Sequence, residues 1–334
     1  MQFGYGFGCR KITRRTMLAT AGTIAAVPAL AAECRIGPAP HEKGPLVFMD
    51  YDQVELDAAY NQEIYEPLLD QVSKRLKFRS VDVRSRLAKA QHVAYGPTGA
   101  ETLDVYRTDR AKAPIFVFIH GGTWRFGSAK DAAHAAEMFV KAGAHYIALD
   151  FVAVQHAGGD LGVMAAQVRR AIAWVYQNAA SFDGDPQRLY VGGHSSGGHL
   201  CGVALVTDWA KEFGLPAEIV KGGLCMSGMF DMAPVQLSWR RSYVHFTDAM
   251  AEAMSPQRHI DKMRAPVVVT YGTLETPEFQ RQSRDFAAAV KVAGKPVELI
   301  EAQYYAHEEM VESLGNPYGP NGRAALALMK LAPT

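Results

Sequence analysis

The sequence is poor in cysteine and has almost no excess of charge. Its four cysteines, Cys9, Cys34, Cys201 and Cys225, form no C-x-x-C pair and no zinc-binding spacing, so neither a full disulfide framework nor a structural zinc site is expected. The formal net charge of +1 over 334 residues gives no electrostatic case for a nucleic-acid or acidic partner.

The N-terminus predicts export. A basic stretch containing Arg14 and Arg15 precedes a mildly apolar run, residues 17–30, and an A-x-A site follows at 29–31. This order is typical of a signal peptide, and the paired arginines resemble a twin-arginine signal. The run is too short for a stable membrane anchor, which needs roughly 20 apolar residues. We expect residues 1–31 to direct the precursor to the twin-arginine export machinery and the protein to be periplasmic or secreted.

Short apolar runs alternate with stretches of helical periodicity along most of the chain. Such alternation indicates an α/β fold with a mostly parallel, doubly wound sheet and helices on both faces. Besides the run that ends at Gly193, the predicted strands are 92–95, 102–106, 114–119, 146–149, 222–226, 266–271 and 296–300.

Composition divides the chain into further segments. A Pro- and Gly-rich linker is expected at 32–46, a charged N-terminal helical arm at 47–90, and the main α/β domain at 91–334. Residues 230–262 contain proline, tryptophan and several charges, and they resemble a lid insertion more than sheet.

The pentapeptide Gly193-His194-Ser195-Ser196-Gly197 is a G-x-S-x-G sequence between an apolar run and a helix-compatible run, 200–210. In a strand–turn–helix setting it is a nucleophile elbow. The serine occupies a strained turn, and the flanking glycines let neighbouring backbone pass closely. Ser195 is therefore the candidate nucleophile.

Acyl transfer also needs a base and an acid that orients the base. In an α/β sheet with a nucleophile elbow, these two residues follow the serine in the order acid, then histidine. His307 is the only histidine after His259 and follows the last predicted strand. Glu275 is favoured as the acid because it lies closest to the end of its strand, with Glu278 and Asp231 as alternatives.

Donors for the oxyanion are expected from two places. Gly121 and Gly122 follow the apolar strand at 114–119, and Ser196 follows the nucleophile, so backbone N–H groups of these residues can point at the developing charge. Trp124 and Tyr305 flank the same loops and are candidate substrate-binding aromatics.

No metal or cofactor is expected. The segment His307-Glu308-Glu309-Met310-Val311 has valine where a zincin needs its second histidine. His194 and His199 flank the elbow without a third ligand at a suitable spacing, which favours packing or a supporting role.

Several segments together match a known family. They are Leu56-Asp57-Ala58-Ala59-Tyr60-Asn61, His120-Gly121-Gly122-Thr123-Trp124, Gly127-Ser128-Ala129-Lys130-Asp131, Gly193-His194-Ser195-Ser196-Gly197-Gly198-His199-Leu200, Ser227-Gly228-Met229-Phe230-Asp231 and residues 275–283. Through these residues the chain resembles the α/β-hydrolase superfamily, and more narrowly its arylformamidase (kynurenine formamidase) and carboxylesterase-like branch, over about residues 50 to 330. The resemblance implies an α/β-hydrolase fold, with Ser195, Glu275 and His307 as the triad and Gly121, Gly122 and Ser196 at the oxyanion hole. The family usually has tyrosine at the Thr123 position and a tyrosine–proline pattern where this chain has 151–156.

The sequence thus predicts a serine hydrolase that cleaves a carboxylic ester or an aryl formamide through an acyl-enzyme. Two alternatives remain open: a catalytically silent hydrolase fold that acts as a binding module, and an acyltransferase that uses the same triad. Ester or formamide preference depends on the shape of the pocket and on protonation of the leaving group, and neither can be derived from the sequence.

Overall fold

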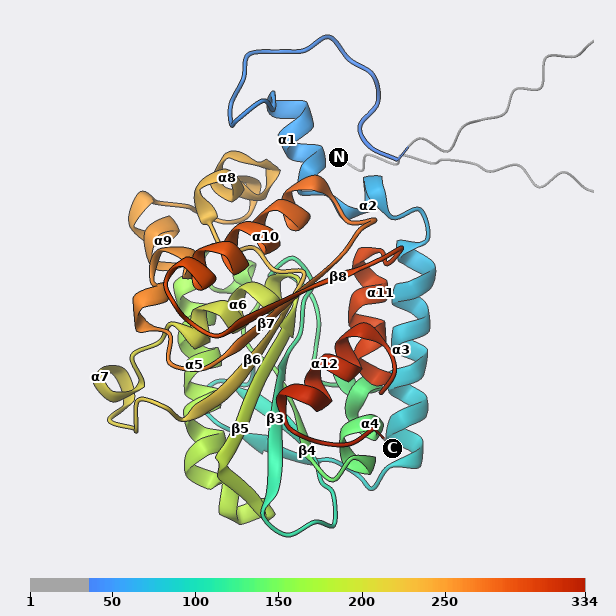
Figure 1. Ribbon diagram of the computed structural model, residues 1–334, viewed down its shortest axis with the longest axis vertical. Coiled ribbons are helices and arrows are strands. Elements are labelled where there is room, and N and C mark those ends of the chain that lie inside the picture. The colour runs from blue at the N-terminus through green and yellow to red at the C-terminus, as the bar shows by residue number, and fades with distance from the viewer. Residues whose placement is uncertain (1–35, 334) are drawn as a thin grey trace, which may run out of the picture. The chain divides into compact units, whose positions relative to one another are not determined.

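The computed structural model describes residues 36–333 of the chain, shown in Figure 1. The signal peptide predicted at 1–31, and the first residues of the linker predicted at 32–46, lie outside the described residues. No helix among residues 36–333 is both long enough and apolar enough to cross a membrane.

Within the described residues the chain forms an eight-stranded sheet in the order β1-β2-β4-β3-β5-β6-β7-β8. β1 pairs antiparallel with β2 and β2 antiparallel with β4, whereas the other neighbours are parallel. This confirms the mostly parallel α/β sheet. The strands are β1 Gln91–Ala94, β2 Thr102–Tyr106, β3 Ala113–Ile119, β4 His145–Leu149, β5 Gly184–His194, β6 Val220–Met226, β7 Val267–Gly272 and β8 Val297–Ala302.

Helices cover both faces of the sheet, and side chains alternate between them (Figure 1). On β3, Ile115 and Val117 enter the core beneath α5, α6 and α10. Phe116 and Phe118 enter the core beneath α4, α12 and the long helix α3 (Leu69–Arg86). Every residue of β3 is buried, which explains its continuous apolar run. The helices are α4 Ala136–Lys141, α5 Leu161–Asn178, α6 Ser196–Leu205, α7 Trp209–Phe213, α10 Pro277–Val292, α11 His307–Glu312 and α12 Pro320–Leu328.

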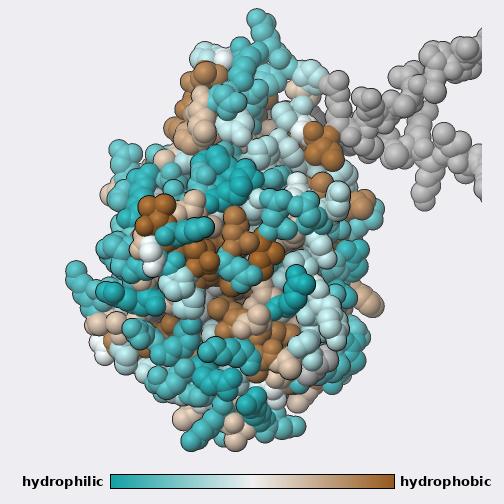
Figure 2. Space-filling view, viewed as in Figure 1, coloured by the Kyte–Doolittle hydropathy of each residue, from teal (hydrophilic) through white to brown (hydrophobic). Residues whose placement is uncertain are grey.

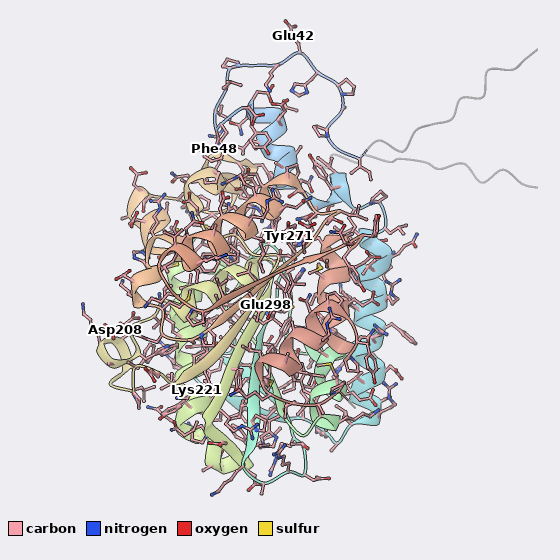
Figure 3. The ribbon with its side chains drawn as sticks, in the orientation of Figure 1. Glu42, Phe48, Asp208, Lys221, Tyr271 and Glu298 are labelled. Carbon is pink, nitrogen blue, oxygen red and sulfur yellow. The ribbon has the colours of Figure 1, made fainter. Side chains whose placement is uncertain are left out.

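The segment predicted as a helical arm, 47–90, contains three helices: α1 Gln53–Ala59, α2 Gln62–Tyr65 and α3 Leu69–Arg86. Pro67 separates α2 from α3, since a proline disfavours helical backbone in the residue before it. The buried Tyr60 ties the arm to α10, because its hydroxyl donates to Glu278 Oε2 (2.9 Å). Just before α1, Phe48, labelled in Figure 3, lies 5.4 Å beneath the guanidinium of Arg281 on α10.

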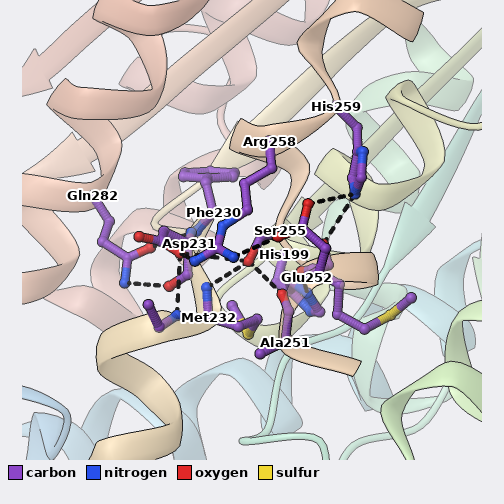
Figure 4. A network of polar contacts seen from close by, with 12 residues as sticks. His199, Phe230, Asp231, Met232, Ala251, Glu252, Ser255, Arg258, His259 and Gln282 are labelled. Carbon is purple, nitrogen blue, oxygen red and sulfur yellow. Dashed lines mark hydrogen bonds and ion pairs between the residues drawn. The ribbon is translucent and has the colours of Figure 1, made fainter. Parts of the chain in front are cut away.

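Residues 230–262, predicted as an insertion, form short helices beside α10. They are α8 Met232–Leu237, η4 Trp239–Ser242, α9 Asp248–Ala253, η5 Pro256–Arg258 and η6 Ile260–Lys262. Ser255 fixes this segment, since its hydroxyl accepts from Met232 N–H (2.8 Å) and donates to Ala251 O (2.6 Å), as Figure 4 shows.

Strand β8 is the edge of the sheet beyond β7 and is mostly exposed or half-buried. Figure 2 shows apolar side chains among polar ones in the middle of the face where β8 crosses, and Leu299 of β8 is 41% exposed. Glu298 and Glu301 interrupt the apolar residues of this edge, and charges of this kind discourage pairing with another chain.

Candidate active site

Ser195 lies on a sharp turn between β5 and α6. Its backbone has φ +56° and ψ −121°, a conformation that L residues rarely adopt, and its N–H donates to Met226 O of β6 (2.9 Å). The side chain is 6% exposed. The strand–turn–helix setting that the pentapeptide needs is therefore present around Ser195.

Two glycines are sterically required at this turn. A Cβ on Gly193 would lie 2.1 Å from Gly197 O, and a Cβ on Gly197 would lie 2.1 Å from Ile119 O at the end of β3. Both contacts involve backbone, which cannot move aside cheaply. The glycines at positions 193 and 197 thus allow the turn to pack against itself and against the neighbouring strand.

His307 and Glu275 meet at the carboxyl end of the sheet. His307 Nδ1 lies 3.0 Å from Glu275 Oε2, and Glu275 Oε1 accepts from Ser227 Oγ (2.6 Å) and Gly272 N–H (2.7 Å). A carboxylate can only accept, so the contact assigns the proton of a neutral imidazole to Nδ1 and leaves Nε2 as the basic nitrogen. Ser195 and His307 line the same cavity.

Burial dominates the electrostatics of this pair. It lowers the pKa of His307 to about 3, with a further contribution from the charge of Arg240, so the neutral imidazole is favoured. Burial also raises the pKa of Glu275 to about 7, and the hydrogen bonds from Ser227 and Gly272 oppose that shift. His307 is therefore neutral in the folded protein, with Nε2 free of a proton.

The other two candidate acids have different partners. Glu278, three residues after Glu275, is fully buried and accepts two hydrogen bonds from Arg281 (2.8 and 2.7 Å) as well as that from Tyr60. Asp231 begins α8, where its carboxylate accepts from Ala233 N–H and pairs with Arg258 (Figure 4). Of the three acids, the structure brings only Glu275 to His307.

The predicted oxyanion donors surround Ser195. A Cβ on Gly121 would lie 3.1 Å from Ser195 Cβ, and Gly122 has φ +109° and lines the cavity. Among the described residues, the amides of Gly121 and Gly122 donate to no backbone acceptor. The N–H of Ser196, in the first turn of α6, has no acceptor within the helix. These donors can receive a negative oxygen next to Ser195.

The two candidate aromatic residues lie elsewhere. Trp124 is 2% exposed, and its indole N–H donates to His199 Nδ1 (3.2 Å) rather than facing the cavity that contains Ser195. Tyr305 lines a separate surface hollow with Arg79 and Glu312. The aromatic side chains that line the cavity are Tyr60, Phe126 and Trp239.

The two histidines beside the elbow connect loops. His194 Nε2 donates to the carbonyl of His307 (2.9 Å), and His199 Nε2 donates to Met254 O (2.8 Å). Burial lowers the pKa of both, that of His199 to about 4. Within residues 36–333, no group of three His, Cys, Asp or Glu side chains is arranged to hold a metal ion.

The cavity has a volume of about 280 Å³ and receives residues from the arm, the loop after β3, the elbow and the 230–262 segment. Sequence reasoning gave no role to Arg240, Tyr60 or Ser227, although Tyr60 and Ser227 belong to segments that carry the family resemblance. Ser227 follows β6 directly, at the strand ends where functional side chains gather, which is a signal that could have been used. Lining residues are Tyr60, Asn61, Gln62, Glu63, Leu69, Gly122, Thr123, Arg125, Phe126, Ser195, Trp239, Arg240, His307 and Glu308.

Comparison with known proteins finds hydrolases among the relatives of this chain. The family model described as BD-FAE matches residues 103–223. The chain is 28% identical over 273 residues to a zebrafish (Danio rerio) kynurenine formamidase, covering 78% of this chain and 90% of the relative. It is 26% identical to Esterase LipQ of Mycobacterium tuberculosis, covering 63% of this chain and 55% of that protein.

Solved structures agree on the fold. A putative thioesterase from Silicibacter sp. tm1040 superposes with a TM-score of 0.72 at 21% identity, covering 83% of this chain and 99% of that one. EstE1, a thermophilic carboxylesterase from a metagenomic library, gives a TM-score of 0.63 at 19% identity, covering 79% and 95%. The matched fold is the α/β-hydrolase fold, as the sequence predicted.

Proposed function

We propose that this member of the α/β-hydrolase superfamily is a serine hydrolase that cleaves a carboxylic ester or an aryl formamide through an acyl-enzyme on Ser195. Its named relatives are hydrolases of amide and ester bonds. The observation that carries the proposal is the His307–Glu275 hydrogen bond at the cavity that also contains Ser195 on its strained turn.

In the proposed first half-reaction, His307 Nε2 takes the proton of Ser195 as the serine oxygen attacks the substrate carbonyl. The negative oxygen that develops is met by N–H groups of Gly121, Gly122 and Ser196. Each such donor is worth about 2.7–4 kcal/mol of barrier in well-studied hydrolases. His307 then gives the proton to the leaving alcohol or amine, and the acyl group stays on Ser195.

In the second half-reaction, water replaces the leaving group. His307 accepts a proton from water as the water oxygen attacks the acyl carbonyl, and Ser195 regains a proton as the acid departs. In its ionised form, Glu275 orients the imidazole through Nδ1 and stabilises the imidazolium. Ser227 and Gly272 support this role because they donate to the other carboxylate oxygen.

The proposal also covers the signal peptide at residues 1–31 and the cell compartment of the mature enzyme. Residues 1–31 would be removed during twin-arginine export, and the enzyme would act in the periplasm or outside the cell. Fusing 1–31 to a reporter, with Arg14→Lys and Arg15→Lys as the matched control, tests this part. Export that survives in the control would contradict it.

The central test is a paired rate assay on purified protein. One substrate is p-nitrophenyl acetate and the other is N-formylkynurenine, each measured with wild type and with Ser195→Ala. Serine-dependent turnover of the formamide supports arylformamidase activity, and turnover of the ester alone supports a carboxylesterase. Hydrolysis that is unaffected in Ser195→Ala contradicts the proposal, as does inactivity of the wild type on both.

A second measurement separates hydrolysis from acyl transfer. Products are analysed after turnover of the ester with and without added alcohol acceptors such as methanol. A product that is almost entirely free acid supports the hydrolase, whereas a dominant new ester supports the acyltransferase alternative.

A further inference from the structure

Arg240 is a buried cation in the cavity wall. It belongs to the short helix η4, its side chain is 1% exposed, and it lines the cavity together with Ser195 and His307. Its neighbour in sequence, Arg241, is exposed. Of these two adjacent arginines, the fold therefore buries Arg240 in the wall of the cavity that contains the candidate nucleophile.

The donors of Arg240 are only partly used. A guanidinium has five N–H donors, but Arg240 Nη1 donates to Tyr243 Oη (2.9 Å), Nη2 donates to Tyr60 O (3.1 Å), and Nε has no partner among the described residues. Both acceptors are neutral. No Asp or Glu oxygen of residues 36–333 forms an ion pair with Arg240.

The half-buried Arg281 of α10 is held differently. Arg281 pairs with both Glu278 and Asp285. Burying a charge without a counter-charge is costly, so an unpaired internal cation calls for an explanation other than stability.

Aromatic rings surround the Arg240 guanidinium. Its central carbon lies 5.4 Å from the ring centre of Trp124, 5.3 Å from that of Trp239 and 6.0 Å from that of Phe279. Ring faces attract a cation but cannot accept the strong hydrogen bonds that a guanidinium offers. They hold the group in place and leave its remaining donors for another acceptor.

A second arginine lines the same cavity. The guanidinium of Arg125 lies 4.9 Å from the ring centre of Tyr243 and 5.1 Å from that of Phe126, and it forms no ion pair with any residue of 36–333. Tyr243 therefore contacts both cations, one through its hydroxyl and one through its ring. Two guanidiniums without carboxylate partners face one cavity of about 280 Å³.

We propose that Arg240, supported by Arg125, binds a carboxylate of the substrate, so that the enzyme prefers esters or amides that carry an anionic group. This inference rests on the proposed function, because it concerns the substrate of the same site. Guanidinium is suited to the role, since its planar fork matches a carboxylate with two parallel hydrogen bonds.

Two acids also line the cavity, and neither pairs with these arginines. Glu63 is exposed to solvent. Burial, with repulsion from Glu66 and Glu275, raises the pKa of Glu308 to about 7, so this carboxyl carries only part of a charge near neutral pH. The charge that a bound group meets beside Ser195 is thus mainly that of the arginines.

The test uses substrates matched in all but charge. For a charge on the acyl side, p-nitrophenyl hydrogen adipate is compared with p-nitrophenyl methyl adipate. For a charge on the leaving group, 3-(4-acetoxyphenyl)propanoate is compared with its methyl ester. We expect wild type to prefer the anionic member of at least one pair by about 10- to 100-fold in kcat/KM, as for a hydrogen bond between charged groups.

Variants assign the preference to Arg240. Arg240→Gln should bring the ratio of kcat/KM for the anionic member to that for the neutral member close to 1, and Arg125→Gln should reduce this ratio partially. The ratio is the readout because the charge of Arg240 also lowers the pKa of His307, so Arg240→Gln is expected to change the rates of both members together. Arg240→Lys should keep part of the preference, since it keeps the charge and loses the fork. Arg258→Gln is the matched control, because Arg258 pairs with Asp231 and Glu252 and does not line the cavity.

A wild-type measurement covers the case in which Arg240→Gln does not fold. Inhibition of neutral-ester hydrolysis by 3-phenylpropanoate is compared with inhibition by 3-phenylpropanamide, and the acid should inhibit at least tenfold more strongly. Equal inhibition by the acid and the amide, together with no preference in either substrate pair, overturns the inference. The proposed function still stands in that case, provided that wild type hydrolyses the esters.

The opposite failure is also distinguishable. Should wild type hydrolyse no ester or amide, the proposed function fails. Calorimetric binding of 3-phenylpropanoate, with 3-phenylpropanamide as the control, then decides whether Arg240 recognises a carboxylate. Binding of the acid that is lost in Arg240→Gln supports the inference, and equal binding of acid and amide overturns it.

Discussion

Two regions meet at the cavity, and they differ in how the buried charged side chain of each is paired. At the strand ends, each oxygen of Glu275 has hydrogen-bond donors and the Nδ1 of His307 has an acceptor. In the wall built by the arm and the 230–262 segment, Arg240 keeps an unpartnered Nε and has no carboxylate partner within the described residues. Both regions are buried, so exposure to water does not explain the difference.

The comparison separates two tasks. Fully paired groups are held in one geometry, which proton transfer requires. A buried cation with unused N–H donors is suited to bind a ligand, since a ligand carboxylate can supply the hydrogen-bond acceptors that the protein does not. The strand ends are therefore expected to tolerate little change, and the wall to tolerate more, with changes there altering which substrate is used.

The largest effect is expected at the elbow. Gly197→Ala would place a Cβ 2.1 Å from Ile119 O, so the turn cannot keep its geometry. We expect loss of measurable esterase activity and destabilisation by more than about 3 kcal/mol, measured by urea unfolding. Gly99→Ala is the control, since a Cβ there meets nothing within 4 Å. An active, stable Gly197→Ala variant would contradict the described turn.

The next effect distinguishes two glutamates three positions apart. Glu275→Gln should lower kcat by roughly 10³–10⁴-fold, because the amide no longer selects the correct imidazole tautomer. Glu278→Gln should instead lower stability by roughly 2 kcal/mol, because it weakens a buried ion pair with Arg281. Steady-state rates and urea unfolding of both variants provide the measurement. Reversed effects would move the orienting acid to Glu278.

A third effect is a pH dependence of stability at His199. Its pKa is lowered to about 4 by burial, so the folded state keeps it neutral while the unfolded chain binds a proton below pH 6.5. The contribution of the neutral His199 to the free energy of unfolding is complete above pH 6.5 and is lost as the pH falls toward 4. Between pH 7.5 and 5.0, wild type should lose roughly 2 kcal/mol more unfolding free energy than His199→Gln. Parallel curves would show that His199 is not held neutral.

The smallest effect is expected in the wall. Phe126 lines the cavity but is 62% exposed, so Phe126→Ala removes little buried area. We expect KM for p-nitrophenyl acetate to rise about two- to fivefold, with kcat nearly unchanged. A loss of kcat as large as that of Glu275→Gln would erase the distinction between the two regions.

The sequence predicted the strand ends better than the wall. The apolar run of β3 and the G-x-S-x-G sequence are local signals, since burial and a strained turn restrict which residues can stand there. The structure also places the favoured acid, Glu275, against His307.

The wall could not be predicted, because it is made by contacts between distant segments. Nothing local indicates that Arg240 is buried and Arg241 exposed, and nothing links Tyr60 to Gln282 across 222 positions. Trp124 illustrates the same limit, since its place beside catalytic loops suggested substrate contact whereas its indole N–H is used by His199.

The hydrogen bond from His194 to the carbonyl of His307 links the loop of the nucleophile to the loop of the base. Because His194 precedes Ser195 in the chain, this hydrogen bond resists any displacement of one loop relative to the other. The spacing of Ser195 and His307 is thus supported by a contact that involves neither the arm nor the 230–262 segment. For protein engineering, libraries restricted to those two segments can vary substrate range while the spacing of the reacting groups is inherited unchanged.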